Sequence, residues 1–102
     1  MRKWDIFLAN VKYEEESVWK VRPVIVFGEN EYYVMSFYST SQKKGFEDEY
    51  EIIEWEAAQL DRKTYARINK MLEIHKTNLL HRIGRLHPID ILGIQEKRKE
   101  LK

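Results

Sequence analysis

An arginine and a proline at the start of an apolar run limit how residues 19–27 can fold. Residues 24–27 (VIVF) are four consecutive β-forming residues, too few to cross a membrane and typical of a buried strand. Pro23 lacks an N–H group, so it fits only at the first residue of a strand or on an edge strand. It also pushes Arg22 towards extended geometry. The sequence therefore predicts a core strand with Arg22 held at its entrance.

Two interpretations of Arg22 follow from this segment. A guanidinium is a planar fork of donors that suits a phosphate, but an arginine before a strand is more often a solvated cation. The next apolar run, 32–38, leads into loop 39–45 (STSQKKG), which has three hydroxyls, two lysines and a glycine. Taken alone, this loop is a polar hairpin connection. When the arginine and the hydroxyl cluster at the two strand ends are considered together, an anion-binding site and a solvated polar surface are equally supported.

Composition narrows the class of protein. With 102 residues the chain predicts one domain over 1–102, and 43% hydrophobic content is enough for a core. Because it has no cysteine, disulfides and thiolate metal sites are excluded. The start has no apolar stretch typical of a signal peptide, and the longest apolar run is far shorter than a membrane span. We therefore expect a cytoplasmic protein without membrane association.

Charge gives no global signal for nucleic acid. The net charge is +1, from 18 Lys and Arg against 17 Asp and Glu. Acidic patches lie at 14–16 and 47–49, and basic patches lie at 62–63 and 97–99. If the protein binds RNA, a local groove must do so.

Strands are expected at residues 4–11, 22–27, 31–38 and 49–53, with a polar loop at 12–20. Residues 54–60 contain helix formers and predict one or two helical turns. Residues 64–68 and 70–75 are two further candidate strands, although 70–74 would also serve as a helix. His87-Pro88 predicts the start of a C-terminal helix, with apolar residues at helical spacing after it.

Six segments in order resemble the PemK/MazF family of toxins from type II toxin–antitoxin systems. They cover nearly the whole length: WDIFLA at 4–9, VRPVIV at 21–26, YSTS at 38–41, YEIIEWEAAQL at 50–60, RINKML at 67–72 and RIGRLHPIDI at 82–91. Short strands first and helices at the end already predict an α+β domain. The resemblance sharpens this to a small SH3-like antiparallel β-barrel with a short internal helix and a C-terminal helix. It also favours a strand at 70–75.

The resemblance implies a metal-independent, sequence-selective endoribonuclease that cleaves single-stranded mRNA through attack of the RNA's own 2′-OH. Arg22 matches the family's catalytic arginine; it stays charged, so we assign it to stabilising the phosphorane. The catalytic hydroxyl falls on Thr40 or Ser41, with Thr40 preferred, and its expected task is to hold a phosphate oxygen. The family further implies a cognate antitoxin, a homodimer and no cofactor.

Three glutamates, Glu14, Glu15 and Glu16, are candidates for the general base, although a solvated acidic loop that repels RNA is favoured. The candidate RNA-binding residues are one aromatic and five cations: Trp19, Lys20, Lys43, Lys44, Arg82 and Arg85. Trp19 is the stacking candidate, because Trp4 and Trp55 are expected in the core. The three histidines are spaced by six and match no zinc signature, so no metal site is predicted.

Two competing functions remain beside the nuclease. One is the same barrel without catalysis, acting as an RNA- or protein-binding module. The other is a gyrase-poisoning toxin of similar fold. Toxins of that class resemble chains that end in an apolar tail with a tryptophan, whereas this chain ends in RKELK at 98–102, so this function is disfavoured.

Overall fold

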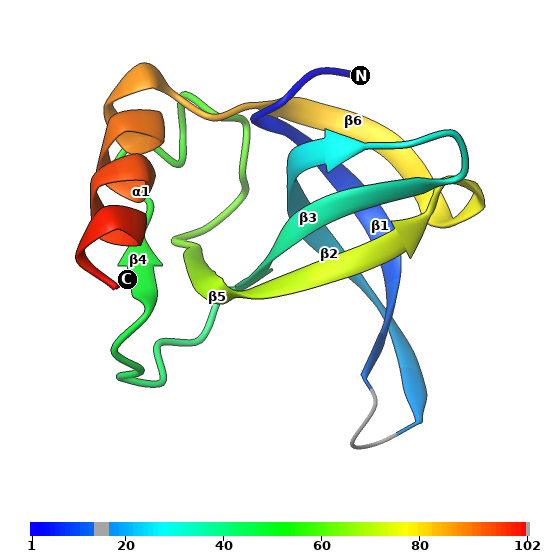
Figure 1. Cartoon of the computed structure of the whole chain (residues 1–102), viewed down its shortest axis with the longest axis horizontal. Coiled ribbons are helices and arrows are strands. Elements are labelled where there is room, and N and C mark those ends of the chain that lie inside the picture. Colours follow the sequence, from blue (N-terminus) through cyan, green and yellow to red (C-terminus); the bar gives the residue numbers. More distant parts are fainter. Residues whose placement is uncertain (14–16, 102) are drawn as a thin grey trace.

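The computed structural model describes residues 1–13 and 17–101. Six strands and a C-terminal helix follow one another along the chain (Figure 1). The strands are β1 (Asp5–Tyr13), β2 (Val18–Glu29), β3 (Tyr33–Thr40), β4 (Glu49–Glu51), β5 (Tyr65–His75) and β6 (Leu79–Arg85). A short 3₁₀ turn, Lys76–Asn78, joins β5 to β6, and α1 spans Pro88–Glu100.

All paired strands are antiparallel and form one sheet in the order β4-β5-β3-β2-β1-β6. Among the described residues, no ladder joins β4 to β6, so the sheet is open and the expected closed barrel is not confirmed. Figure 1 shows β4 and α1 together on one side, with the long β1–β2 arm extending away from them. The α+β class and the antiparallel sheet are confirmed.

The curled sheet buries apolar side chains on both faces. Ile25 lies in a cluster with Ile6, Phe37 and Ile94, which packs between the sheet and α1. Its neighbour Val24 belongs to a second cluster around Ala9, Val11 and Ile74. Alternating side chains point to opposite faces of a strand, so a run that is apolar at every position is what a strand buried on both faces requires.

Several predicted boundaries shift. The two strands expected at 64–68 and 70–75 are one strand, β5, and the alternative helix at 70–74 is wrong. A register shift between Phe37 and Tyr38 in their pairing with β5 lets the strand continue through an irregular segment. The loop expected at 12–20 is shorter, because β1 reaches Tyr13 and β2 begins at Val18. The expected strand entrance at Arg22 is therefore wrong: Arg22 is the fifth residue of β2, and it pairs with Ala9 because the ladder with β1 extends along the arm. Sequence analysis assigned no element to 79–85, where β6 pairs with β1.

The internal helix expected at 54–60 is a hydrogen-bonded turn instead. Ala58 N donates to Glu54 O at 3.1 Å, which closes a single α-type turn. Gln59 then adopts the left-handed conformation, with φ at 69°, and the helix does not propagate. Gly84 of β6 passes so close that a Cβ there would lie 2.3 Å from the Ala58 carbonyl oxygen. The turn is thus fitted against the sheet.

The C-terminal helix begins where the sequence predicted. Pro88 occupies its first turn, where the missing N–H costs nothing. His87 caps the helix, since its Nδ1 accepts a hydrogen bond of 3.1 Å from Ile89 N. No helix within the described residues is long and apolar enough to cross a membrane.

Candidate active site

A pocket of about 380 Å³ lies between the first half of β2, the end of β3 and the segment after β4. The three residues expected to be catalytic, Arg22, Thr40 and Ser41, all line it. The remaining lining residues are Leu8, Val21, Pro23, Gln59, Leu60, Asp61, Arg62, Thr64 and Ile83. Residues far apart in the sequence therefore meet at one surface hollow.

Pro23 shapes this pocket. The recorded pairing of β2 with β3 ends at Ile25 opposite Phe37. Pro23 has no N–H to extend the ladder, and its carbonyl instead accepts a hydrogen bond from the Ser39 hydroxyl. Counting the register onwards from Ile25 and Phe37 brings Arg22 opposite Thr40. The proline thus ends the pairing at the point where the arginine and the hydroxyl come together.

The polar groups on this wall are held by short-range contacts. Arg22 is half-buried and its Nη1 donates to Val21 O at 3.3 Å. Thr40 Oγ1 accepts a hydrogen bond of 3.2 Å from Gln42 N, which leaves its own hydrogen able to donate. Ser41 is exposed. Ser39, the remaining hydroxyl of the run, is buried and donates to the Pro23 carbonyl, so its role is structural.

The opposite wall holds two charged residues that sequence reasoning missed as site residues, Asp61 and Arg62. Arg62 Nε and Nη2 approach the two carboxylate oxygens of Asp61 at 3.3 and 3.4 Å. The sequence marks Arg62 only as part of a basic patch at 62–63, because nothing local places it beside Arg22. The lining carries two guanidiniums against one carboxylate, and its net charge favours an anion.

The start of the segment that forms this wall is anchored by Asp90, in the first turn of α1. The carboxylate is fully buried and accepts hydrogen bonds from Tyr50 OH (2.7 Å), Ile53 N (2.8 Å) and Glu54 N (2.9 Å). Burial and the bond to Asp90 raise the pKa of the Tyr50 phenol. Asp90 therefore fixes the start of the turn whose other end, from Gln59, lines the pocket.

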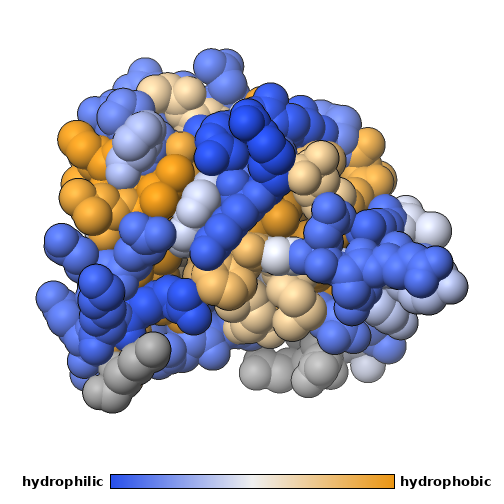
Figure 2. Space-filling model, turned by 45° about the horizontal axis from the view of Figure 1, so that its top comes forward, coloured by the Kyte–Doolittle hydropathy of each residue, from blue (hydrophilic) through white to orange (hydrophobic). Residues whose placement is uncertain are grey.

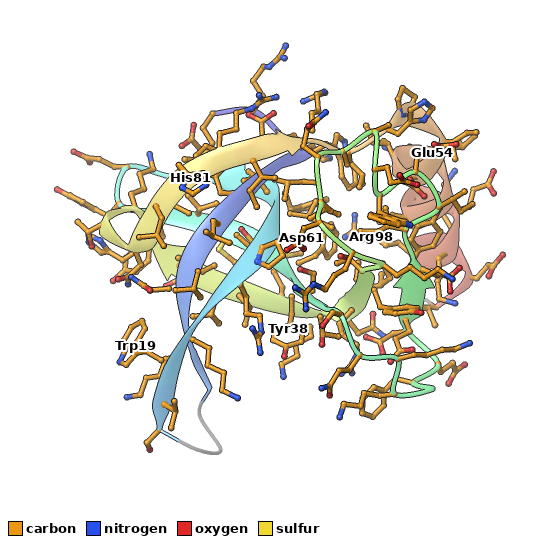
Figure 3. The ribbon with its side chains drawn as sticks, turned by 180° about the vertical axis from the view of Figure 1, so that it is seen from behind. Trp19, Tyr38, Glu54, Asp61, His81 and Arg98 are labelled. Carbon is orange, nitrogen blue, oxygen red and sulfur yellow. The ribbon has the colours of Figure 1, made fainter. Side chains whose placement is uncertain are left out.

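The structure does not bring the expected RNA-binding residues into the pocket lining. Lys43 and Lys44 are exposed in the loop after β3, where Lys44 N donates to Glu49 Oε2 at 2.7 Å. Lys20 is half-buried on β2, and Trp19 is exposed on the β1–β2 arm, away from Asp61 (Figure 3). The candidate bases at 14–16 lie outside the described residues.

Arg82 and Arg85 both pair with the buried carboxylate of Asp5, each with an N–O distance of 3.4 Å. Arg85 also donates to Lys3 O at 2.8 Å. Burial would raise the pKa of Asp5, but hydrogen bonds from the Arg2 amide and the two guanidiniums lower it overall. These arginines therefore join the chain's first residues to β6, and both remain partly exposed.

Within residues 1–13 and 17–101, no group of three or more His, Cys, Asp or Glu side chains is arranged to hold a metal ion. His75 instead accepts a hydrogen bond from Thr77 N at 3.2 Å and caps the 3₁₀ turn.

Comparison with known proteins places the fold. No family model and no curated protein sequence matches the chain. Among solved structures, it is similar to a Mycobacterium tuberculosis toxin, MazF-mt6, at 17% identity and a TM-score of 0.73, covering 91% of this chain and 90% of that one. An endoribonuclease from Mycobacterial species in complex with its cognate antitoxin gives 12% identity, a TM-score of 0.75 and coverages of 95% and 89%. Another endoribonuclease from Mycobacterial species gives 11% identity and a TM-score of 0.72, covering 95% of this chain and 86% of that one. The resemblance expected from the sequence is confirmed at the level of the fold: the chain has the fold of MazF toxins.

Proposed function

We propose that the protein is a PemK/MazF-type toxin, an endoribonuclease that cleaves single-stranded mRNA at selected sequences without a metal. One observation carries the proposal. In a chain with the MazF fold, Arg22, Thr40 and Ser41 line the same pocket, opposite a second guanidinium, Arg62.

The chemistry follows from the groups in this pocket. The 2′-oxygen of the RNA attacks the adjacent phosphorus, and the bond to the 5′-oxygen breaks, which leaves a cyclic phosphate and a 5′-hydroxyl. The phosphorane gathers negative charge on its oxygens, and preorganised donors stabilise it most where water is displaced. Arg22 supplies a fixed positive charge, and Thr40 or Ser41 donates a hydrogen bond to a phosphate oxygen.

Binding of the RNA strand extends beyond the pocket. We assign stacking on a base to exposed Trp19, and backbone contacts to Lys20, Lys43 and Lys44. Arg82 and Arg85 contribute less to RNA binding in this proposal, because both guanidiniums already pair with Asp5.

The proposal includes a cytoplasmic location, a cognate antitoxin and a homodimer. A surface for protein contacts exists beside α1, where Ile53, Ile89 and Leu92 are exposed. Figure 2 shows apolar side chains at the surface on the side where α1 lies. Light scattering of the purified protein tests the dimer, and Leu92→Glu should lower the measured mass if this surface forms the contact.

The test of the activity is incubation of the purified protein with a long single-stranded RNA in EDTA, followed by mapping of the new 5′ ends. Discrete cuts that recur at one short sequence are expected. Intact RNA that nevertheless binds the protein would contradict the nuclease and favour a binding module. Cuts that appear only when magnesium is restored would contradict metal independence.

A further inference from the structure

Attack by a 2′-hydroxyl requires a group that accepts its proton. Arg22 and Arg62 stay charged and accept no proton, and a threonine or serine hydroxyl is too weak a base at neutral pH. Among the described residues that line the pocket, Asp61 is the only carboxylate, and there is no histidine. The pocket thus contains one side chain with the chemistry of a general base.

Asp61 lies in a short segment that is pinned at both ends. Before it, Leu60 is buried and its N–H donates to Trp55 O at 3.0 Å. After it, buried Thr64 accepts at its carbonyl a hydrogen bond of 3.0 Å from Ile52 N. The Thr64 hydroxyl also donates to Arg62 O at 3.0 Å. Three residues between two fixed points have little freedom, so the backbone of Asp61 is held beside the pocket that this residue lines.

The surroundings of Asp61 suit proton transfer. Its side chain is 81% exposed, so a proton taken from the substrate can pass to water. Arg62 Nε and Nη2 lie 3.3 and 3.4 Å from the two carboxylate oxygens of Asp61, and this positive charge offsets the repulsion between the carboxylate and a phosphate in the pocket. Figure 3 shows Asp61 near the middle of the view, on the segment that joins β4 to β5.

We propose that Asp61 is the general base of the cleavage reaction, a role that rests on the proposed ribonuclease function. Asp61 takes the proton of the 2′-hydroxyl as the 2′-oxygen forms its bond to phosphorus. The bond from phosphorus to the 5′-oxygen then breaks, and the 5′-oxygen takes a proton from water. The protonated carboxyl finally returns its proton to solvent, so the enzyme is regenerated with no other reactant.

The experiment compares wild type with Asp61→Asn on an oligonucleotide that spans a mapped cut, under single-turnover conditions from pH 4 to 8. General-base catalysis is worth on the order of 100-fold or more, so Asp61→Asn should lose about that much rate at pH 7. Wild type should slow as the pH falls and the carboxylate takes up a proton, whereas Asp61→Asn should lack this acid limb. Asp61→Glu should retain it.

Binding separates this role from a structural one. The same oligonucleotide with a 2′-deoxy nucleotide at the cut should bind Asp61→Asn within a few-fold of wild type. Glu96→Gln, an exposed change on α1, should leave rate and pH profile unchanged.

An Asp61→Asn enzyme that keeps its rate and its acid limb overturns the inference while the nuclease function stands. An Asp61→Asn enzyme that only binds the oligonucleotide more weakly also overturns it. If Asp61→Asn loses its circular dichroism signal, Asp61→Glu decides the question, because a folded Asp61→Glu enzyme without the acid limb overturns the inference. If the rate loss appears instead in a combined Glu14→Gln, Glu15→Gln and Glu16→Gln variant, the base lies in that segment. A wild type that cuts no RNA overturns both this inference and the proposed function.

Discussion

Replacing Asp90 by alanine should destabilise the fold by about 3 kcal/mol, or about 1 kcal/mol for each donor left without its acceptor. The Asp90 carboxylate is fully buried and joins α1 to Tyr50 and to the backbone amides of Ile53 and Glu54. Removing it leaves three donors that folding had withdrawn from water.

The magnitude depends on how far water can replace the carboxylate. Three fully buried donors at up to about 3 kcal/mol each would set an upper limit of about 9 kcal/mol. Ile53 is exposed, and Tyr50 and Glu54 are only half-buried, so water can satisfy part of each group and reduce the sum. About 3 kcal/mol lowers the Tm of a domain of this size by roughly 12–24 °C. Tyr50→Phe removes a single hydrogen bond and should cost about 1 kcal/mol.

The assay is urea unfolding followed by far-UV circular dichroism, with the slope m compared between variants. Glu96→Ala, on an exposed position of the same helix, should stay within about 0.5 kcal/mol of wild type. An Asp90→Ala protein that loses less than about 1 kcal/mol, or no more than Tyr50→Phe, would refute the view that this carboxylate anchors the turn.

Three further outcomes are expected. Arg22→Ala should fold and lose on the order of 100- to 1,000-fold in cleavage rate, with only partial rescue by lysine; a folded variant at full rate would exclude a catalytic arginine here. Thr40→Ala and Ser41→Ala should differ in rate and the double variant should be inactive, so a double variant at the wild-type rate would remove the hydroxyl from the mechanism. Burial would raise the pKa of Asp48, but bonds from Asn69 N (2.9 Å) and Arg67 Nε (2.8 Å) lower it overall. A lowered pKa gives stability that is present above the unfolded value of about 3.9 and is lost as the pH falls through the folded value. The urea midpoint of Asp48→Asn should therefore depend less on pH between about 5 and 3 than that of wild type, and equal slopes would contradict this.

Much of the sheet follows from the sequence, because its strands carry local signals. The apolar run after Pro23 predicted the core of β2, although the strand begins earlier, at Val18, and His87-Pro88 predicted the start of α1. Residues 79–85 have no such alternation, and β6 exists because it pairs with β1. The helix propensity of 54–60 did not produce a helix, because Gln59 adopts the left-handed conformation and ends the turn.

The candidate site was predictable only in part, because only some of its residues belong to strands with local sequence signals. Arg22 lies on β2 and Thr40 ends β3, and these two strands follow one another in the chain, so their hairpin brings the two residues to one pocket. Asp61 and Arg62 reach the pocket through an irregular segment whose path is set by tertiary contacts. No local pattern in the sequence encodes that path.

Cleavage of an oligonucleotide that lacks one 2′-hydroxyl is the measurement that tests 2′-OH attack in the Arg22 pocket most directly. The oligonucleotide spans a mapped cut and carries hydrogen in place of the 2′-OH on the 5′ side of that cut, and the reaction contains EDTA. We expect no cleavage, and we expect the substituted strand to inhibit cleavage of the normal RNA competitively, since phosphate contacts and stacking persist. Cleavage of the substituted strand at the normal rate would contradict attack by the 2′-oxygen.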